Sequence, residues 1–223
     1  MRQPYSGLTG IILFSLIYVF IVSFGEISYF NVMASVRPEI INYPTSYSAS
    51  GNIYYVRTDG SDSNDGTGPE TSKAWATITK AVSAVEPGDV VYVRAGTYTY
   101  QVTITNNESG TAALPIQFIG DKNGEIWSDA PGDVTIDVTS TGGTYCIYFN
   151  GGDYWTFKDF KLTGSSSHGL YAVGDSHHNT FDGLEITDIG TGGGCSAILL
   201  EGSDASINPR NTIIKNCDIE GDF

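Results

Sequence analysis

Positive charge and cysteine are both scarce in this chain of 223 residues. Lys and Arg number 11 against 25 Asp and Glu, which gives a net charge of −14. A surface of this sign repels phosphate backbones, so we expect no nucleic-acid partner. Three cysteines, Cys146, Cys195 and Cys217, are an odd number without the short spacing of a zinc site. They indicate neither a disulfide framework nor a metal centre, and we interpret them as small buried apolar residues.

A long apolar run is also missing. The run 11–22 is shorter than the about 20 residues of a membrane span, and it matches the core of a signal peptide. We therefore expect a signal peptide at 1–25, with a second cleavage site near 34 and an uncleaved anchor as the alternative. Export predicts a secreted or cell-surface protein, without stable membrane association unless the segment is retained. Residues 26–51 contain several Pro and Ser residues and are interpreted as a linker.

Residues 52–223 have the composition of a turn-rich all-β domain. Only 16% of the chain is charged, whereas glycine contributes 27 residues. Apolar spacing predicts one amphipathic helix over 72–85, which ends before Pro87 and Gly88. The remaining apolar segments are short and predict strands. The expected strands in the first half of the domain are 53–57, 90–94, 101–105, 116–119 and 134–138.

Internal repetition is the strongest feature of the second half. The segment TFKDFKLT (156–163) returns as TFDGLEIT (180–187) and again as IIKNCDIE (213–220), at intervals of roughly 24 and 33 residues. A unit of this size with strands and turns but no helix cannot bury its apolar side alone, so the units must stack. The pattern predicts a right-handed parallel β-helix with one N-terminal capping helix, and we expect it to be incomplete at the C-terminus.

Stacking predicts which side chains are neighbours, since equivalent positions in adjacent coils lie about 4.8 Å apart. Two outward columns follow from the repeat alignment, and oppositely charged neighbours in them support the same register. The predicted columns are Lys158, Asp182 and Lys215, and Lys161, Glu185 and Asp218. We interpret these charges as stabilising pairs rather than as acid–base machinery.

Three segments near the start of the domain resemble a known family. They are YYVRTDGSDSNDGT (54–67), WATITKAVSAV (75–85) and PGDVVYVRAGTY (87–98). They resemble the N-terminal cap and first coil of secreted pectin-lyase-like β-helix proteins, in particular pectate lyases of polysaccharide lyase family nine and their relatives. In those lyases the resemblance implies calcium held by an aspartate cluster and a lysine that removes the proton beside the uronate carboxylate. No Asp-rich run followed by Lys occurs in 145–223, so no catalytic residue is carried over.

Two groups of residues are candidates for binding. Asp59, Asp62 and Asp65 offer three carboxylates to a hard cation such as Ca²⁺, although turn structure explains them as well. The outward positions of a second strand family form a candidate sugar platform, for which simple sheet packing is the alternative. The residues of this platform are Tyr148, Tyr171, Asn150 and Glu201.

The remaining polar candidates lie in one turn. His177 and His178 are adjacent in DSHHN, and we expect neighbouring turn side chains to point apart and to be solvated. Asn179, at the bend, is expected to cap backbone groups rather than to bind substrate.

Three functions remain open from the sequence. The preferred one is a polysaccharide lyase that acts on uronate-containing glycans by Ca²⁺-assisted β-elimination, without an organic cofactor. The second is a non-catalytic surface or glycan-binding rod, and the third is a β-helix glycoside hydrolase with converging carboxylates. Because no closing segment follows the last repeat, we expect an N-terminal fragment whose catalytic residues lie beyond residue 223.

Overall fold

The structure is a computed structural model, and it describes residues 51–190, 194–202 and 209–220. Two compact units divide the chain, Met1–Thr45 and Ser46–Phe223, and every described residue belongs to the second. The expected signal peptide and nearly all of the expected linker lie outside the described residues. Within the described part, no helix is long and apolar enough to cross a membrane.

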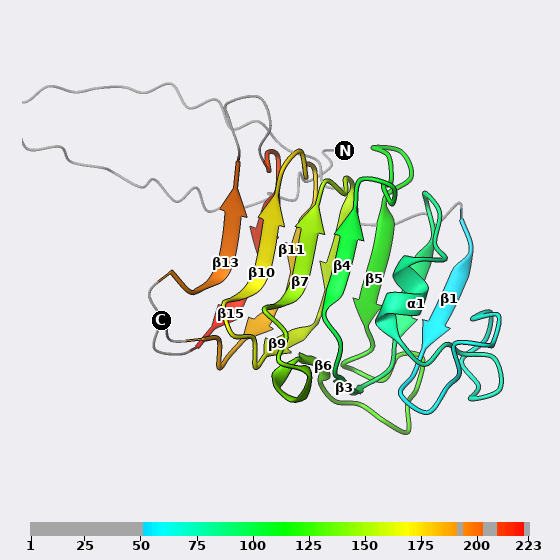
Figure 1. Cartoon of the computed structure of the whole chain (residues 1–223). Helices are drawn as coiled ribbons and strands as arrows, with labels where there is room; N and C mark the ends of the chain where they lie inside the picture. Colours follow the sequence, from blue (N-terminus) through cyan, green and yellow to red (C-terminus); the bar gives the residue numbers. More distant parts are fainter. Residues whose placement is uncertain (1–50, 191–193, 203–208, 221–223) are drawn as a thin grey trace, which may run out of the picture. The chain divides into compact units, whose positions relative to one another are not determined.

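The described unit is a stack of coils that form three parallel sheets, as the sequence predicts (Figure 1). From β2 onward, each coil visits sheet A, sheet B and sheet C in turn. Sheet A contains β1 (Ile53–Val56), β2 (Val90–Val93), β5 (Ile116–Gly120), β8 (Trp155–Lys158), β11 (Thr180–Asp182) and β14 (Ile213–Lys215). Sheet B contains β3 (Gly96–Tyr98), β6 (Val134–Asp137), β9 (Lys161–Thr163), β12 (Glu185–Ile186) and β15 (Asp218–Ile219). Sheet C contains β4 (Val102–Thr105), β7 (Tyr145–Asn150), β10 (His168–Val173) and β13 (Ser196–Glu201).

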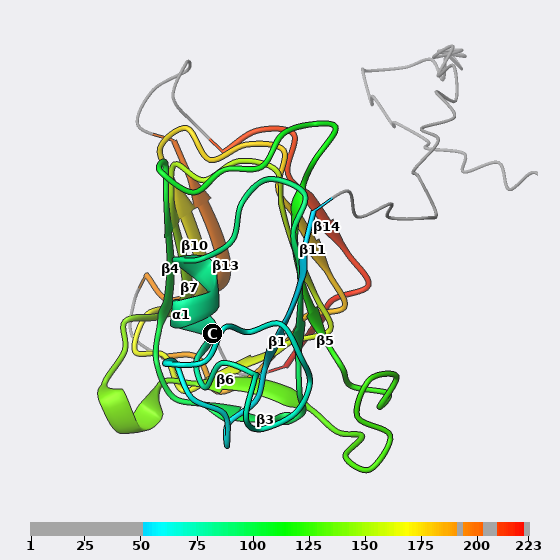
Figure 2. The ribbon, with the colours of Figure 1, turned by 90° about the vertical axis from the view of Figure 1, so that its right-hand side faces the viewer.

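The capping helix is much shorter than the sequence predicts. Helix α1 spans only Ile78–Val82, because Thr77 is its N-cap and Trp75 forms an isolated parallel bridge with Val56. Trp75 is therefore strand-like and lies outside the helix, although its spacing in the sequence fits a helix. Helix α1 packs beside β4 at the edge of sheet C, so it covers the strand edge that an earlier coil would otherwise pair with (Figure 2).

Two short elements were not predicted. Strand β3 (Gly96–Tyr98) has three residues and starts with glycine, so it is too short to show alternation. The 3₁₀ helix η1 (Thr139–Thr141) follows β6 in a run of polar residues without apolar periodicity. Strand β3 is the edge strand of sheet B, and η1 lies in the connection from sheet B to sheet C.

The strand register confirms both predicted charge columns. Asp182 is the pairing partner of Lys158 on one side and of Lys215 on the other, and the Lys215 Nζ lies 3.4 Å from the Asp182 Oδ2. Lys158 instead donates to the carboxylate of its neighbour Asp159 at 2.6 Å. The second column pairs Glu185 with Lys161 and Asp218, and Lys161 donates to Glu185. Register inferred from apolar residues therefore places the charges correctly.

The interior between the sheets is filled by columns of large apolar side chains. Phe118, Phe157 and Phe181 are paired positions of sheet A, and the first two rings stack with centroids 5.2 Å apart. All three are fully buried. The corner that follows sheet A needs a left-handed backbone in three successive coils, at Asp159, Gly183 and Asn216.

Asn179 caps backbone groups, as the sequence predicts, and these groups belong to the preceding coil. Its Oδ1 accepts from the backbone N–H of Trp155 at 2.9 Å, and its Nδ2 donates to the carbonyl of Gly152 at 2.8 Å. The side chain is buried, so both of its polar groups replace backbone partners that the turn would otherwise leave unpaired.

We predict that Phe181→Ala lowers the free energy of unfolding by about 3–5 kcal/mol, because it opens a cavity between the coils above and below. Ile119→Ala is the control, since Ile119 lies in a middle strand of sheet A but is only half-buried, and its loss should be much smaller. Urea unfolding of both variants provides the comparison. Equal losses would contradict the assignment of the interior column.

Candidate functional site

The three aspartates proposed as metal ligands each serve a separate local partner. Asp59 accepts from the Nε and an Nη of Arg57 at 2.6 and 2.9 Å, and this bond holds the pKa of Asp59 below its usual value. Asp62 accepts from the backbone N–H groups of Ala76 and Thr77, both at 2.9 Å. Asp62 also accepts from the Thr77 hydroxyl at 2.8 Å, which ties the loop to the start of α1.

Asp65 stabilises the turn in which it lies by bonding to Thr67, two residues further along the chain. Its Oδ1 accepts from the backbone N–H of Thr67 at 3.0 Å and from the Thr67 hydroxyl at 2.8 Å, and the backbone bond lowers the pKa of Asp65. The three carboxylates therefore face different partners and do not fit a shared calcium site. Among the described residues, no group of three or more His, Cys, Asp or Glu side chains is placed to hold a metal ion.

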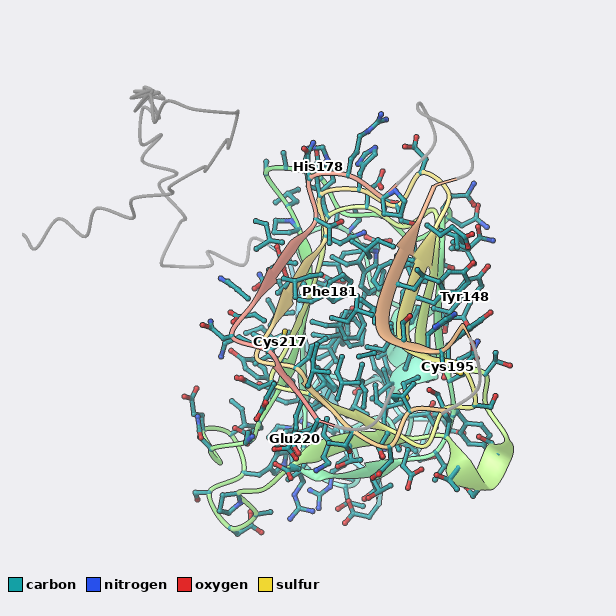
Figure 3. All side chains as sticks on the ribbon, turned by 90° about the vertical axis from the view of Figure 1, so that its left-hand side faces the viewer. Tyr148, His178, Phe181, Cys195, Cys217 and Glu220 are labelled. Carbon is teal, nitrogen blue, oxygen red and sulfur yellow. The ribbon has the colours of Figure 1, made fainter. Side chains whose placement is uncertain are left out.

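The outer face of sheet C brings together most of the residues proposed as a sugar platform. Tyr148 and Tyr171 are direct pairing partners, as predicted, and their rings stack with centroids 5.6 Å apart. Asn150 and Glu201 share the next column, but Val173 lies between them, so they do not meet. Figure 3 shows Tyr148 on the outer side of the sheet and Phe181 inside the stack.

Two further rings join this face, and the sequence reasoning missed both. Tyr145 lies 5.2 Å from Tyr148 and 4.8 Å from Tyr171, between ring centroids. His168 is the pairing partner of Tyr145, and the two rings are parallel with centroids 5.8 Å apart. Strict alternation would turn Tyr145 inward, but both following residues, Cys146 and Ile147, are buried instead. Only the break in alternation could have revealed Tyr145.

The ring arrangement decides what the face can offer to a ligand. Tyr148 and Tyr171 stack on one another along the column, so much of each ring face is covered by its neighbour. The Tyr171 hydroxyl donates to Glu201, and this bond raises the pKa of Tyr171 to about 12. Tyr171 therefore stays protonated at ordinary pH and does not serve as a general base. The face presents ring edges and hydroxyl groups rather than open aromatic surfaces.

The electrostatics of this face are neutral to acidic. None of the four strands of sheet C contains Lys or Arg, and their one ionisable carboxylate is Glu201. The lysines of the charge columns lie on sheets A and B instead. A negatively charged ligand therefore meets no compensating cation from the strands of sheet C.

The two adjacent histidines do not point apart, which corrects the expectation from the sequence. Their Nδ1 atoms lie 2.9 Å apart, so one ring donates and the other accepts. Asp153 holds His177, with its Oδ1 3.2 Å from the His177 Nδ1, and Tyr154 stacks on His178 with centroids 4.7 Å apart. The left-handed backbone at His178 turns its ring back over Tyr154. These partners come from the preceding coil and orient both rings.

The cysteines agree only in part with their interpretation as buried apolar residues. Cys146 is fully buried, and burial raises the pKa of its thiol to about 12. Cys195 and Cys217 are half-buried at coil positions nearer the end of the described stack. All three are free thiols.

Parallel coils, three sheets and a short cap define a right-handed parallel β-helix. The family described as the Pel9A-like right-handed β-helix region matches residues 54–219, and the chain belongs to this family. This confirms the resemblance drawn from the cap and the repeats.

Two curated relatives are similar in sequence to part of this chain. Pectate lyase L of Dickeya dadantii (strain 3937) is 32% identical over 161 residues, which cover 66% of this chain and 36% of that protein. Pectate lyase PEL9 of Emericella nidulans is 30% identical over 136 residues, covering 57% of this chain and 31% of that protein. The chain thus spans about a third of the length of these relatives.

A GH136 lacto-N-biosidase from Eubacterium ramulus superimposes with a TM-score of 0.59 at 14% identity. The match covers 76% of this chain and 34% of that one. At this identity the likeness reflects the fold alone.

We predict that Asp62→Ala lowers the free energy of unfolding by about 1–2 kcal/mol, because three donors at the start of α1 lose their acceptor. Asp65→Ala is the control and should cost less, since it breaks only a local turn. Thermal melts with and without CaCl₂ provide the measurement. A calcium-dependent rise in melting temperature that Asp62→Ala abolishes would contradict the structural role.

We also predict that Glu201→Gln lowers the pKa of Tyr171 from about 12 toward the ordinary tyrosine value, because the hydrogen bond to a carboxylate is lost and the negative charge that opposes ionisation is removed. Ring-¹³C tyrosine NMR against pH measures this, with Tyr171→Phe to assign the signal. Because the folded pKa is raised, the bond stabilises the fold below pH 10 and this contribution disappears as the pH rises to about 12. Glu220→Gln should leave the titration unchanged.

Proposed function

We propose that this chain is part of a secreted or cell-surface carbohydrate-active protein, a polysaccharide lyase that acts on uronate-containing glycans. The observation that carries the proposal is membership of the Pel9A-like family over residues 54–219. Two curated relatives that share about a third of their length with the chain are named pectate lyases, which supports a polysaccharide as the substrate. The apolar run at 11–22 in the sequence supports export.

The proposed reaction is β-elimination with calcium. A base removes the proton on the carbon beside the uronate carboxylate, and the glycosidic C–O bond on the neighbouring carbon breaks to leave a C=C double bond. The departing sugar oxygen takes the bonding electrons and then a proton, so it leaves as a hydroxyl group. Calcium would supply the positive charge that stabilises the carboxylate during this step. We assign no part of the reaction to the described residues, because Asp59, Asp62 and Asp65 have other partners and Tyr171 stays protonated.

A second candidate is a glycan-binding rod without catalysis. The geometry of sheet C favours it, since paired tyrosines and polar groups line up along one face of stacked coils. In this case the coils display ring edges and hydroxyl groups, and a polysaccharide is held without being cleaved. The two candidates differ in turnover, so one assay separates them.

We predict that the protein, purified at the full length encoded by its gene, releases unsaturated uronate from polygalacturonate, with ultraviolet absorbance as the readout. Absorbance should rise with CaCl₂ and stop rising with EDTA. If the folded protein migrates more slowly in gels that contain polygalacturonate but produces no change in absorbance, the non-catalytic binding function is correct. If it neither binds nor cleaves polygalacturonate, the uronate assignment is wrong.

A further inference from the structure

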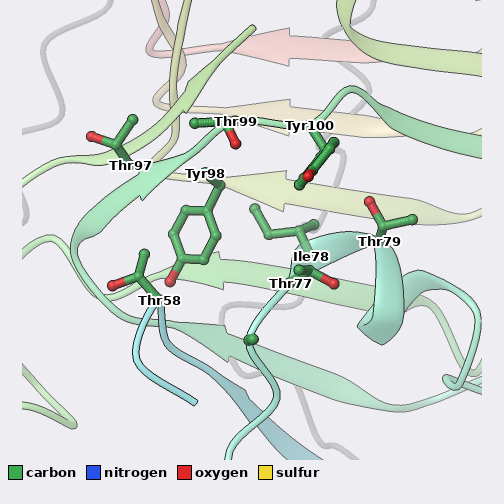
Figure 4. A pocket seen from close by; sticks show the side chains of 9 residues that line it. Thr58, Thr77, Ile78, Thr79, Thr97, Tyr98, Thr99 and Tyr100 are labelled. Carbon is green, nitrogen blue, oxygen red and sulfur yellow. The ribbon is translucent and has the colours of Figure 1, made fainter. Parts of the chain in front are cut away.

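Two adjoining hollows lie where the cap helix meets the connection between β3 and β4, and Figure 4 shows the first of them. The first has a volume of about 180 Å³ and the second of about 560 Å³, and they share Thr77, Thr79 and Tyr100. The larger volume falls within the roughly 300–1,000 Å³ of small-molecule sites. The other residues around them include Thr58, Thr97, Tyr98, Gln101, Thr103 and Thr141.

No charged side chain lines either hollow, although the chain as a whole carries a net charge of −14. The lining consists of hydroxyl groups, one carboxamide, two phenol rings and small apolar groups. Asp62, the carboxylate bonded to Thr77, is negative and already occupied by its three donors. A uronate carboxylate entering here would lose water without gaining a cation, whereas neutral hydroxyl groups would find partners.

Tyr100 is the exposed aromatic ring at this place. Its side chain is 62% exposed, and within the described part of the chain it has no ring partner. In this it differs from Tyr148 and Tyr171, whose faces cover one another. A free aromatic face is what the C–H side of a pyranose ring packs against. Figure 4 shows Tyr100 and Thr79 on opposite elements that line the same hollow, one on the strand connection and one on the helix.

Among the polar side chains beside Tyr100, Gln101 is held in place by hydrogen bonds, whereas Thr79 is available to a ligand. The Gln101 Oε1 accepts from the Tyr145 backbone N–H at 3.2 Å, and its Nε2 donates to the Thr103 hydroxyl at 3.1 Å. The amide is thereby fixed before any ligand arrives, which reduces the ordering cost of binding. Within the described residues, the hydroxyl group of Thr79, which lines both hollows, has no hydrogen-bond partner, so it can bond to a ligand.

We propose that these hollows bind an uncharged sugar unit of a polysaccharide, with Tyr100 packing on the pyranose face and Thr79 bonding to its hydroxyl groups. The site lies at the cap, next to the start of sheet C, and is separate from the Tyr148–Tyr171 column. It does not depend on lyase activity, because binding is measured without turnover. Neutral-sugar recognition would anchor the chain on glycans in which uncharged stretches or branches accompany uronate.

The experiment is isothermal titration calorimetry of the full chain with cellohexaose, xylohexaose, mannohexaose, galactohexaose and hexagalacturonate. At least one neutral hexamer should bind more tightly than hexagalacturonate, with little dependence on NaCl. Tyr100→Ala should weaken that binding about tenfold, and Thr79→Val about threefold, whereas Tyr100→Phe should stay near the wild type. Tyr92→Ala is the matched control, since it removes a half-buried tyrosine from sheet A.

The outcomes separate this site from the rest of the molecule. Circular dichroism first establishes that each variant is folded, and Thr79→Val tests the site should Tyr100→Ala not fold. Failure of every neutral hexamer to bind, or unchanged binding in Tyr100→Ala and Thr79→Val, overturns the proposal. Loss in Tyr148→Ala alone would move the neutral-sugar site to the sheet C column. None of these outcomes changes the polygalacturonate assay, so the two proposals fail independently.

Discussion

Backbone pairing between consecutive coils is the constraint on which the rest of this molecule depends. Each short strand satisfies its N–H and C=O groups on the coils before and after it, at a spacing of about 4.8 Å. No coil has enough apolar area to fold alone, so coil and neighbour must share one register. In sheet A this register runs from β1 to β14, and it fixes which side chain lies above which.

Because the register is fixed, each side chain must be compatible with the side chains above and below it in the same column. Inside, like residues favour one another, as Phe118 and Phe157 do when they stack at 5.2 Å. Outside, like charges at this spacing repel, and the column Lys158, Asp182 and Lys215 alternates in sign, with Lys215 beside Asp182. Sheet C avoids the problem differently, because its outer columns carry rings and amides and only one carboxylate. The three sheets thus present chemically distinct faces.

This regularity explains which features could be predicted from the sequence and which could not. The repeats predicted the fold and both charge columns, because one apolar spacing recurs in three coils, at 156–163, 180–187 and 213–220, and fixes their phase. Helix 72–85 was too long, since Trp75 has helical spacing but is bound by the Val56 bridge and by Asp62 contacts to its neighbours. Tyr145 was missed because alternation breaks at Cys146. Tyr100 carries no periodic signal, since the connection between β3 and β4 belongs to no repeat.

Within such a stack, function can vary where few neighbouring residues constrain a side chain. Strand positions are constrained by two neighbours each, so a change there disturbs three coils at once. Turns and the cap have fewer partners, and the two residues proposed to bind the sugar come from such segments, with Thr79 on the cap helix and Tyr100 on a connection. Asp62 ties the loop beneath to the helix start and keeps that rim in place without occupying it. A binding site can therefore change its ligand here while the register of the coils stays intact.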